Sequence, residues 1–144
     1  MVAVELTKGH GAVGLAALGA VILHNYFGAC VMKARKQYKV TYPKMYAEGD
    51  SAEAKAFNSV QRGHMNYVEN LPQYIILQVA SSFQYPMASA VLGGTYLLGR
   101  LLYFQGYSKT GPKGREAGAV VGVIANLGML GLGVKFCYDL LVKS

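Results

Sequence analysis

Four long apolar stretches, separated by short polar ones, account for most of the chain. They extend over about residues 11–32, 57–83, 87–107 and 117–142. Helices of this length reach across a hydrocarbon core of roughly 30 Å, because each residue adds about 1.5 Å. Only His24 and Asn25 interrupt the first stretch, which is too long for the core of a signal peptide. The pattern predicts an all-α protein: an integral membrane four-helix bundle with up-and-down connections.

The composition supports a membrane protein. With 144 residues the chain has the length of one domain, and we expect residues 1–144 to form a single transmembrane unit. Hydrophobic residues make up 53% of the chain and charged residues 15%, and the mean hydropathy is +0.26. Soluble domains contain about 25% charged residues, so this composition argues against an ordinary soluble domain.

Most of the basic residues lie in two of the connections between the apolar stretches. The net charge is +7 and the pI is about 9.4, values that nucleic-acid-binding proteins also show. The basic residues are Lys33, Arg35, Lys36, Lys39 and Lys44 after the first stretch, and Lys109, Lys113 and Arg115 before the fourth. An up-and-down bundle brings both connections to one side, and the positive-inside rule places that side in the cytosol. We therefore expect no nucleic-acid partner.

Cysteine and histidine form no ligand cluster in the sequence. Cys30 and Cys137 lie in different apolar stretches without C-x-x-C spacing, and His10, His24 and His64 are scattered. A zinc site needs three or four converging ligands. We predict no metal site and no redox role for the cysteines.

Glycines gather in the fourth stretch, at Gly118, Gly122, Gly128, Gly131 and Gly133. Small residues let transmembrane helices approach closely. The cluster therefore predicts tight helix packing rather than a phosphate-binding loop.

A polar stripe lies within the second apolar stretch. Arg62, Asn66 and Glu69 are spaced i, i+4 and i+7, which places them on one helix face, and Pro72 follows. An ionisable side chain inside a bilayer costs about 2.5–3.5 kcal/mol, so such groups normally face a bundle interior, a cavity or a ligand. The stripe is the first candidate site. The alternative is an internal ion pair of Arg62 with Glu69 that only fixes helix packing.

A second polar group is predicted at the basic end of the third stretch. Arg100, Tyr103 and Tyr107 recur on one helix face, glycines and Pro112 then break the helix, and Arg115 opens the next one. Together these side chains would form a patch of phenols and guanidinium groups. Tyrosines at a membrane boundary also serve as interfacial anchors, which is the alternative interpretation.

The two polar groups suit one kind of ligand. A small peptide with two carboxylates, one ammonium group and a thiol would match them, since arginines fork onto carboxylates, Glu69 receives the ammonium and Asn66 bridges polar groups. A further arginine can stabilise a thiolate, the form of a thiol that attacks electrophiles.

The segment QRGHMNYVENLP resembles the second-helix signature R-x-H-x-N-x-x-E-x-x-P of the membrane-associated proteins in eicosanoid and glutathione metabolism. The histidine, with KARKQYKVTYPKMY, is most similar to the microsomal glutathione S-transferase 3 branch of that family. RLLYFQGY is similar to the corresponding segment of the leukotriene C4 synthase branch. The resemblance covers residues 33–115.

This resemblance implies a homotrimer of four-helix subunits in the lipid bilayer, with glutathione bound between neighbouring subunits near the cytosolic face. The implied glutathione-binding residues are Arg62, Asn66, Glu69, Tyr103 and Tyr107 of one subunit, with Arg35 and His64 of the next. The implied catalytic residues are Arg115, which would stabilise the glutathione thiolate, and Tyr107, a possible auxiliary hydrogen-bond donor.

The sequence therefore predicts a membrane-bound glutathione transferase with glutathione-dependent peroxidase activity. Glutathione is the co-substrate, and the second substrate is a lipophilic electrophile or a lipid hydroperoxide that arrives from the bilayer. We expect the protein in the endoplasmic reticulum (microsomal) or the mitochondrial outer membrane. Two alternatives stay open: conjugation of the leukotriene C4 synthase type, and a non-catalytic membrane subunit of a larger assembly.

Overall fold

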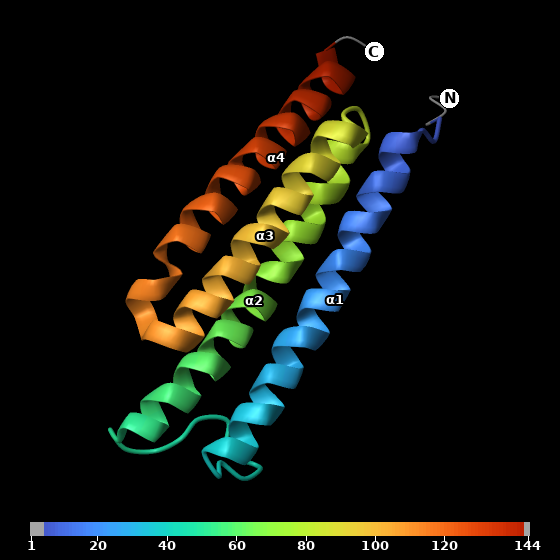
Figure 1. Cartoon of the computed structure of the whole chain (residues 1–144). Coiled ribbons are helices and arrows are strands. Elements are labelled where there is room, and N and C mark those ends of the chain that lie inside the picture. Colours follow the sequence, from blue (N-terminus) through green and yellow to red (C-terminus); the bar gives the residue numbers. More distant parts are fainter. Residues whose placement is uncertain (1–4, 143–144) are drawn as a thin grey trace.

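The computed structural model describes residues 5–142, and over this range the chain contains helices and no strand. The helices are α1 (Lys8–Gln37), α2 (Ala52–Ser82), α3 (Pro86–Thr110), the short 3₁₀ helix η1 (Gly111–Arg115) and α4 (Glu116–Val142). The four α-helices run alternately up and down, so that α1 begins and α4 ends at the same end (Figure 1). The predicted all-α class is confirmed.

Both basic connections lie at the opposite end, which we call the basic end. The α1–α2 connection and η1 are both there, and the α1–α2 connection extends beyond η1 (Figure 1). This arrangement agrees with the predicted placement of the two connections on one side of the bundle.

Local sequence accounts for the helix ends. The side chain of Ser51 accepts a hydrogen bond from the backbone N–H of Ala54 and caps α2, and Pro86 occupies the first turn of α3. Gly111 ends α3 with a φ of 73°, a backbone conformation that favours glycine. One boundary differs from the prediction. α3 continues to Thr110, and Arg115 is the last residue of η1 rather than the first of α4.

Aromatic residues fill the interior between the helices. The rings of Tyr74 and Tyr96 stack with their centroids 4.7 Å apart, beside the buried side chain of Met129. A second cluster contains Phe27 and Phe104, whose ring centroids are 4.1 Å apart. Stacked aromatic pairs of this kind add about 0.5–1.5 kcal/mol beyond the area that they bury.

Glycines allow α3 and α4 to approach closely. A Cβ atom added to Gly99 would lie 2.7 Å from the backbone nitrogen of Gly122, and one added to Gly118 would collide with the backbone of Tyr103. The predicted packing role therefore holds for Gly118, whereas a Cβ added to Gly122 would make only an ordinary 3.8 Å contact with the ring of Tyr96. Within the single chain the role does not hold for Gly131, because a Cβ added there would meet no atom within 4 Å outside its own stretch of helix.

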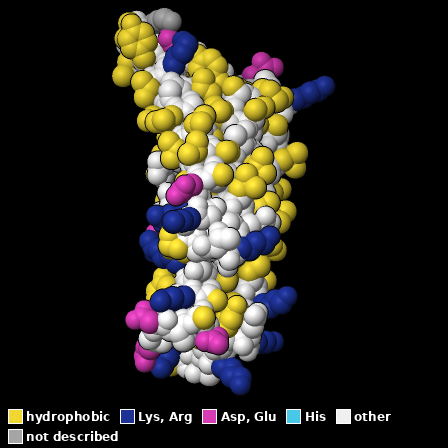
Figure 2. All heavy atoms as spheres, turned by 60° about the vertical axis from the view of Figure 1, so that its left-hand side comes forward, with side chains coloured by type: hydrophobic (Ala, Val, Ile, Leu, Met, Phe, Trp, Pro, Cys, Tyr) yellow, Lys and Arg dark blue, Asp and Glu magenta, His cyan; other side chains and the backbone are white. Residues whose placement is uncertain are grey.

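Two helical stretches among the described residues are long and apolar enough to cross a membrane, Lys8–Gln37 and Pro86–Val142. The second joins α3, η1 and α4. The helix α2, which covers the span predicted over about residues 57–83, is not among them. Large apolar side chains such as Ile22, Val91 and Leu127 are exposed on these helices. Figure 2 shows apolar side chains gathered over the upper half of one face, with charged side chains concentrated toward the basic end.

Candidate functional site

Arg62 and Glu69 form a two-point ion pair along one face of α2. The two nitrogen–oxygen distances are 2.7 Å for Nη1 to Oε1 and 3.2 Å for Nη2 to Oε2. The side chains are 44% and 45% exposed, so the pair lies on the outside of the single chain and not in its core. Arg62 and Glu69 therefore form the ion pair that the sequence left open as an alternative. This pair does not hold two helices of the chain together, because both residues belong to α2.

Asn66 lies between the two charged residues on the same helix and reaches toward α3. Its side-chain oxygen accepts a hydrogen bond from Nη2 of Arg100, which is 7% exposed. The Arg100 guanidinium also lies 4.5 Å from the ring centre of Tyr103. Within residues 5–142, Arg100 has no carboxylate partner, and its Nε atom is buried without a hydrogen bond. Buried cations normally face an anion, and among the described residues this one faces none.

The predicted patch of phenols and guanidinium groups comes together at the basic end. Nη1 of Arg115 donates to the hydroxyl of Tyr103 at 3.4 Å, and its guanidinium lies 5.5 Å from the ring centre of Tyr107. The two tyrosine rings are 5.9 Å apart. Through Tyr103, Arg115 is connected to Arg100 and from there to Asn66. The structure thus joins the two polar groups that the sequence treats separately.

Arg35 is turned toward the α1–α2 connection. Its Nη1 donates to the carbonyl oxygens of Lys44 at 2.7 Å and Val40 at 3.4 Å, and its guanidinium lies 4.4 Å from the ring centre of Tyr42. Within one chain, no contact joins Arg35 to Arg62. Any contact of Arg35 with that site would have to come from a second subunit.

His64 is also separated from the polar stripe within one chain. It follows Arg62 by two residues, or about 200° around the helix axis, and so faces another side of α2. Its ring packs against His24 of α1, with 5.3 Å between the ring centroids. One nitrogen of each ring, Nε2 of His64 and Nδ1 of His24, is buried without a hydrogen-bond partner. The sequence gave no reason to place His24 beside His64, because the contact depends on how α1 packs on α2.

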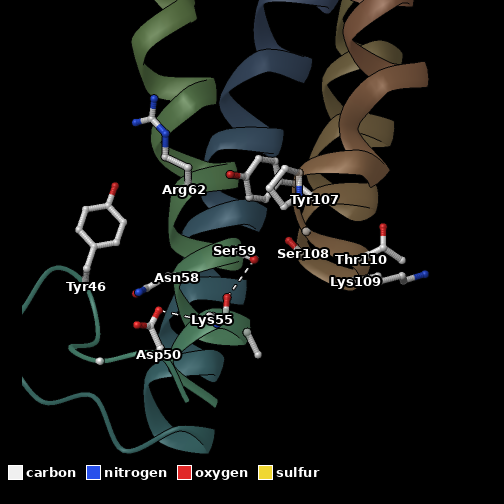
Figure 3. Close-up of a pocket in the computed structure, with 14 residues that line it drawn as sticks. Tyr46, Asp50, Lys55, Asn58, Ser59, Arg62, Tyr107, Ser108, Lys109 and Thr110 are labelled. Atoms are coloured by element: carbon white, nitrogen blue, oxygen red, sulfur yellow. Dashed lines mark hydrogen bonds and ion pairs between the residues drawn. The ribbon is translucent and has the colours of Figure 1, made fainter. Parts of the chain in front are cut away.

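A groove of about 680 Å³ opens at the basic end, between α2 and the end of α3 (Figure 3). Arg62 and Tyr107 are the predicted site residues that line it, together with residues of the α1–α2 connection. Its volume falls within the range of about 300–1,000 Å³ that is typical of ligand sites. Among the described residues, no three His, Cys, Asp or Glu side chains form a group that could hold a metal ion.

Comparison with known proteins confirms the family noted in the sequence, while the similarity to its microsomal glutathione S-transferase 3 branch stays a prediction. Human microsomal glutathione S-transferase 2 is 34% identical over 117 residues, which cover 78% of this chain and 76% of the relative. Bovine leukotriene C4 synthase is 33% identical over 91 residues, covering 62% of this chain and 57% of the relative. The model of the MAPEG family matches residues 13–135. Because this match spans most of the chain, the protein belongs to the MAPEG family.

Proposed function

We propose that the protein is a membrane-bound glutathione transferase that also reduces lipid hydroperoxides with glutathione. Relatives that carry the names glutathione S-transferase and leukotriene C4 synthase support a transferase. The chemistry of the polar residues supports glutathione as the co-substrate, and the peroxidase activity follows from the same activated sulfur. The two reactions begin with the same thiolate, which attacks a carbon atom in one and a peroxide oxygen in the other.

The observation that carries the proposal is the half-exposed ion pair of Arg62 with Glu69 on a helix whose neighbours have apolar outer faces. An ion pair facing lipid would be costly, since charged groups inside a bilayer cost about 2.5–3.5 kcal/mol each. A second subunit packed against this face would remove the pair from lipid. We therefore propose a homotrimer of single-domain, four-helix transmembrane subunits, with a site between each pair of neighbours.

Glutathione can replace the ion pair charge for charge. Its carboxylates match the fork of Arg62, and its ammonium group matches Glu69, so neither residue is left unpaired after binding. Asn66 and Tyr103 provide further polar contacts, while the buried charge of Arg100 lies behind them. Arg35 and His64, which point away from this group within one chain, would approach it from the next subunit.

Arg115 and Tyr107 are placed to act on the glutathione sulfur. A guanidinium group favours the thiolate over the thiol, and a phenol can donate a hydrogen bond to the same sulfur. In conjugation the thiolate sulfur forms a bond to an electrophilic carbon and the leaving group departs. In peroxide reduction it attacks one oxygen, the O–O bond breaks, and an alcohol leaves after protonation. A second glutathione then converts the resulting sulfenic acid into the disulfide and water.

The membrane setting explains the second substrate. We propose that all four α-helices cross the bilayer, with the basic end in the cytosol, in the endoplasmic reticulum or the mitochondrial outer membrane. A lipophilic electrophile or hydroperoxide would then reach the site sideways from the lipid, where it is concentrated. The identity to bovine leukotriene C4 synthase favours conjugation of that type as the second candidate function. A non-catalytic membrane subunit would need neither Arg115 nor the buried Arg100, which has no carboxylate partner among the described residues.

An activity assay on the detergent-purified protein tests the proposal. Glutathione is combined with either a chlorodinitrobenzene-type electrophile or a fatty-acid hydroperoxide, and the conjugate or the glutathione disulfide is measured. Turnover with both substrates is expected. Turnover with neither, from protein that is folded and trimeric, would favour the non-catalytic subunit.

A further inference from the structure

The groove at the basic end has a charge pattern that suits an anionic peptide. Lys55 and Arg62 lie on its α2 wall, and Lys109 lies on the α3 wall (Figure 3). Asp50 is its acidic residue, and the carboxylate is already 3.7 Å from the ammonium group of Lys55. Glutathione carries two carboxylates and one ammonium group, so its net charge is opposite to that of the groove.

Two residues connect the groove to the candidate site. Arg62 lines the groove and also forms the ion pair with Glu69, while Tyr107 lines it and also lies beside Arg115. A ligand in the groove is therefore already in reach of both polar groups of the site. We propose that the groove is a binding station at which the anionic peptide thiol docks from the aqueous side before it reaches Glu69 and Arg115. This inference rests on the proposed function and extends it to residues that lie outside the site described above.

Tyr46 is the aromatic residue of the α1–α2 connection that lines the groove, and its hydroxyl points toward the guanidinium of Arg62 (Figure 3). Ala47, the residue after Tyr46, is held by two hydrogen bonds to Asn58. The side-chain amide of Asn58 accepts a hydrogen bond from the backbone N–H of Ala47 at 2.8 Å and donates one to its carbonyl oxygen at 2.9 Å. Arg35 holds the same segment through the carbonyl of Lys44. Tyr46 is therefore a recognition residue of the groove, and Asn58 is the positioning residue that orients it.

Lys109 is the cation of the opposite wall, and its side chain runs away from α2, so it acts on a docking anion through its charge rather than by a direct contact (Figure 3). Within residues 5–142 it forms no ion pair, and its side chain is exposed. Lys113, four residues further along in η1, is also exposed but does not line the groove. The two lysines thus serve as a test variant and its control. Reversing the charge of either one changes the net charge of the protein equally, but only the change at Lys109 alters the lining of the groove.

Stopped-flow measurement of thiolate formation tests the inference in the intact, detergent-purified protein, with glutathione as the probe. We expect Lys109→Glu to lower the association rate constant about five- to tenfold at low ionic strength and Lys113→Glu to lower it less than about twofold. In about 1 M salt the difference should disappear, because charges are then screened beyond roughly 3 Å. Tyr46→Phe should weaken glutathione binding several-fold, and Asn58→Leu alone should weaken it by the same factor. The double variant should bind glutathione no more weakly than Tyr46→Phe alone.

The outcomes separate this inference from the proposed function. If wild-type protein forms no thiolate with glutathione, the proposed function fails and the inference fails with it. If the wild type forms the thiolate but the two lysine variants associate at equal rates, the groove is not the docking station and only the inference is overturned. Additive effects of Tyr46→Phe and Asn58→Leu would likewise overturn the positioning role of Asn58.

Discussion

The guanidinium of Arg100 on α3 donates a hydrogen bond to the side-chain oxygen of Asn66 on α2, although 34 residues separate the two in the sequence. This contact joins a buried cation to the middle of the polar stripe. It also explains how α3 takes part in the candidate site, since the same guanidinium lies 4.5 Å from the ring centre of Tyr103. Arg100 therefore belongs to the site through the residues that it orients.

Replacing Arg100 with methionine should lower glutathione affinity without unfolding the protein. Methionine keeps most of the packing volume, and exchanging a buried charge for an apolar side chain of similar size is often neutral for stability. Asn66 loses its partner, so the effects of Arg100→Met and Asn66→Ala should be coupled by about 0.5–3 kcal/mol in a double-mutant cycle. Calorimetry with glutathione measures the affinities. Strictly additive effects would show that the two residues act independently.

Alanine at Arg62 or at Glu69 should weaken glutathione binding strongly. Each variant loses a charge-assisted contact of about 1.5–3 kcal/mol, which corresponds to roughly ten- to a hundred-fold in affinity. Calorimetry on the detergent-solubilised variants provides the measurement, with trimer formation followed in parallel. Unchanged affinity in both variants would assign the ion pair to structure alone.

Exchanging the two charges gives the matched control for this pair. Arg62→Glu combined with Glu69→Arg keeps an ion pair on the same helix face, but it reverses the positions of the cation and the anion. A purely structural pair would tolerate the exchange. A pair that binds glutathione should not, because the ammonium group would then face a cation, and we expect the affinity to stay at least tenfold below that of the wild type.

The sequence predicted helices and shared helix faces correctly where all the residues of a pattern lie on one helix. Hydropathy located α1 to α4 to within a few residues, and helical spacing predicted that Arg62 and Glu69 share a face. The neighbourhood of Tyr103, Tyr107 and Arg115 was also within reach, because α3 and α4 are joined by a short connection.

Contacts between helices that are distant in the sequence could not be predicted from the sequence. The Arg100–Asn66 hydrogen bond and the His24–His64 contact depend on how the helices rotate and pack, which no spacing rule provides. The role of Arg35 in holding the α1–α2 connection could not be read from a basic cluster, since its partners are backbone carbonyls. Spacing also could not separate Gly99, which is in tight contact, from Gly131, which is not.

Gly99→Ala should destabilise the protein, whereas Gly131→Ala should not. The added methyl group at position 99 would lie 2.7 Å from the backbone nitrogen of Gly122, so α3 and α4 would have to separate. Overpacking of this kind costs about 1–3 kcal/mol. Position 131 has open space around it within the chain, and alanine favours the helix there. Thermal unfolding in detergent compares the two. Equal unfolding temperatures would argue against the close contact of α3 with α4.

A cysteine introduced at Thr41 should react with an impermeant thiol reagent from the cytosolic side of sealed vesicles. Thr41 is exposed in the α1–α2 connection, among the basic residues that the positive-inside rule places in the cytosol. The background variant has Cys30 and Cys137 replaced by alanine. Met87→Cys, which is exposed at the opposite end of the bundle, should react only after the vesicles are opened. The reverse labelling pattern would invert the topology.

Arg115→Ala should lower the fraction of bound glutathione that is ionised to the thiolate more than it lowers the affinity for glutathione. The guanidinium lies beside Tyr103 and Tyr107, and under the proposed function it would stabilise the negative charge of the glutathione sulfur there. Without it, the pKa of the bound thiol should rise toward the free value of about 8.5. At pH 7 the thiolate fraction and the turnover number should both fall, and both should recover in part as the pH rises through that value, because the thiol then ionises without help.

Ultraviolet thiolate absorbance and turnover measured across the same pH range check this prediction, and Lys113→Ala is the matched control. It removes one cation from the same short helix without touching either tyrosine, so its pH profile should follow the wild type. If both variants shift alike, the effect comes from the general positive charge of the basic end. If Arg115→Ala keeps a normal thiolate signal at pH 7, another cation stabilises the sulfur. Arg100 is then the first arginine to replace, because it is buried and has no carboxylate partner among residues 5–142.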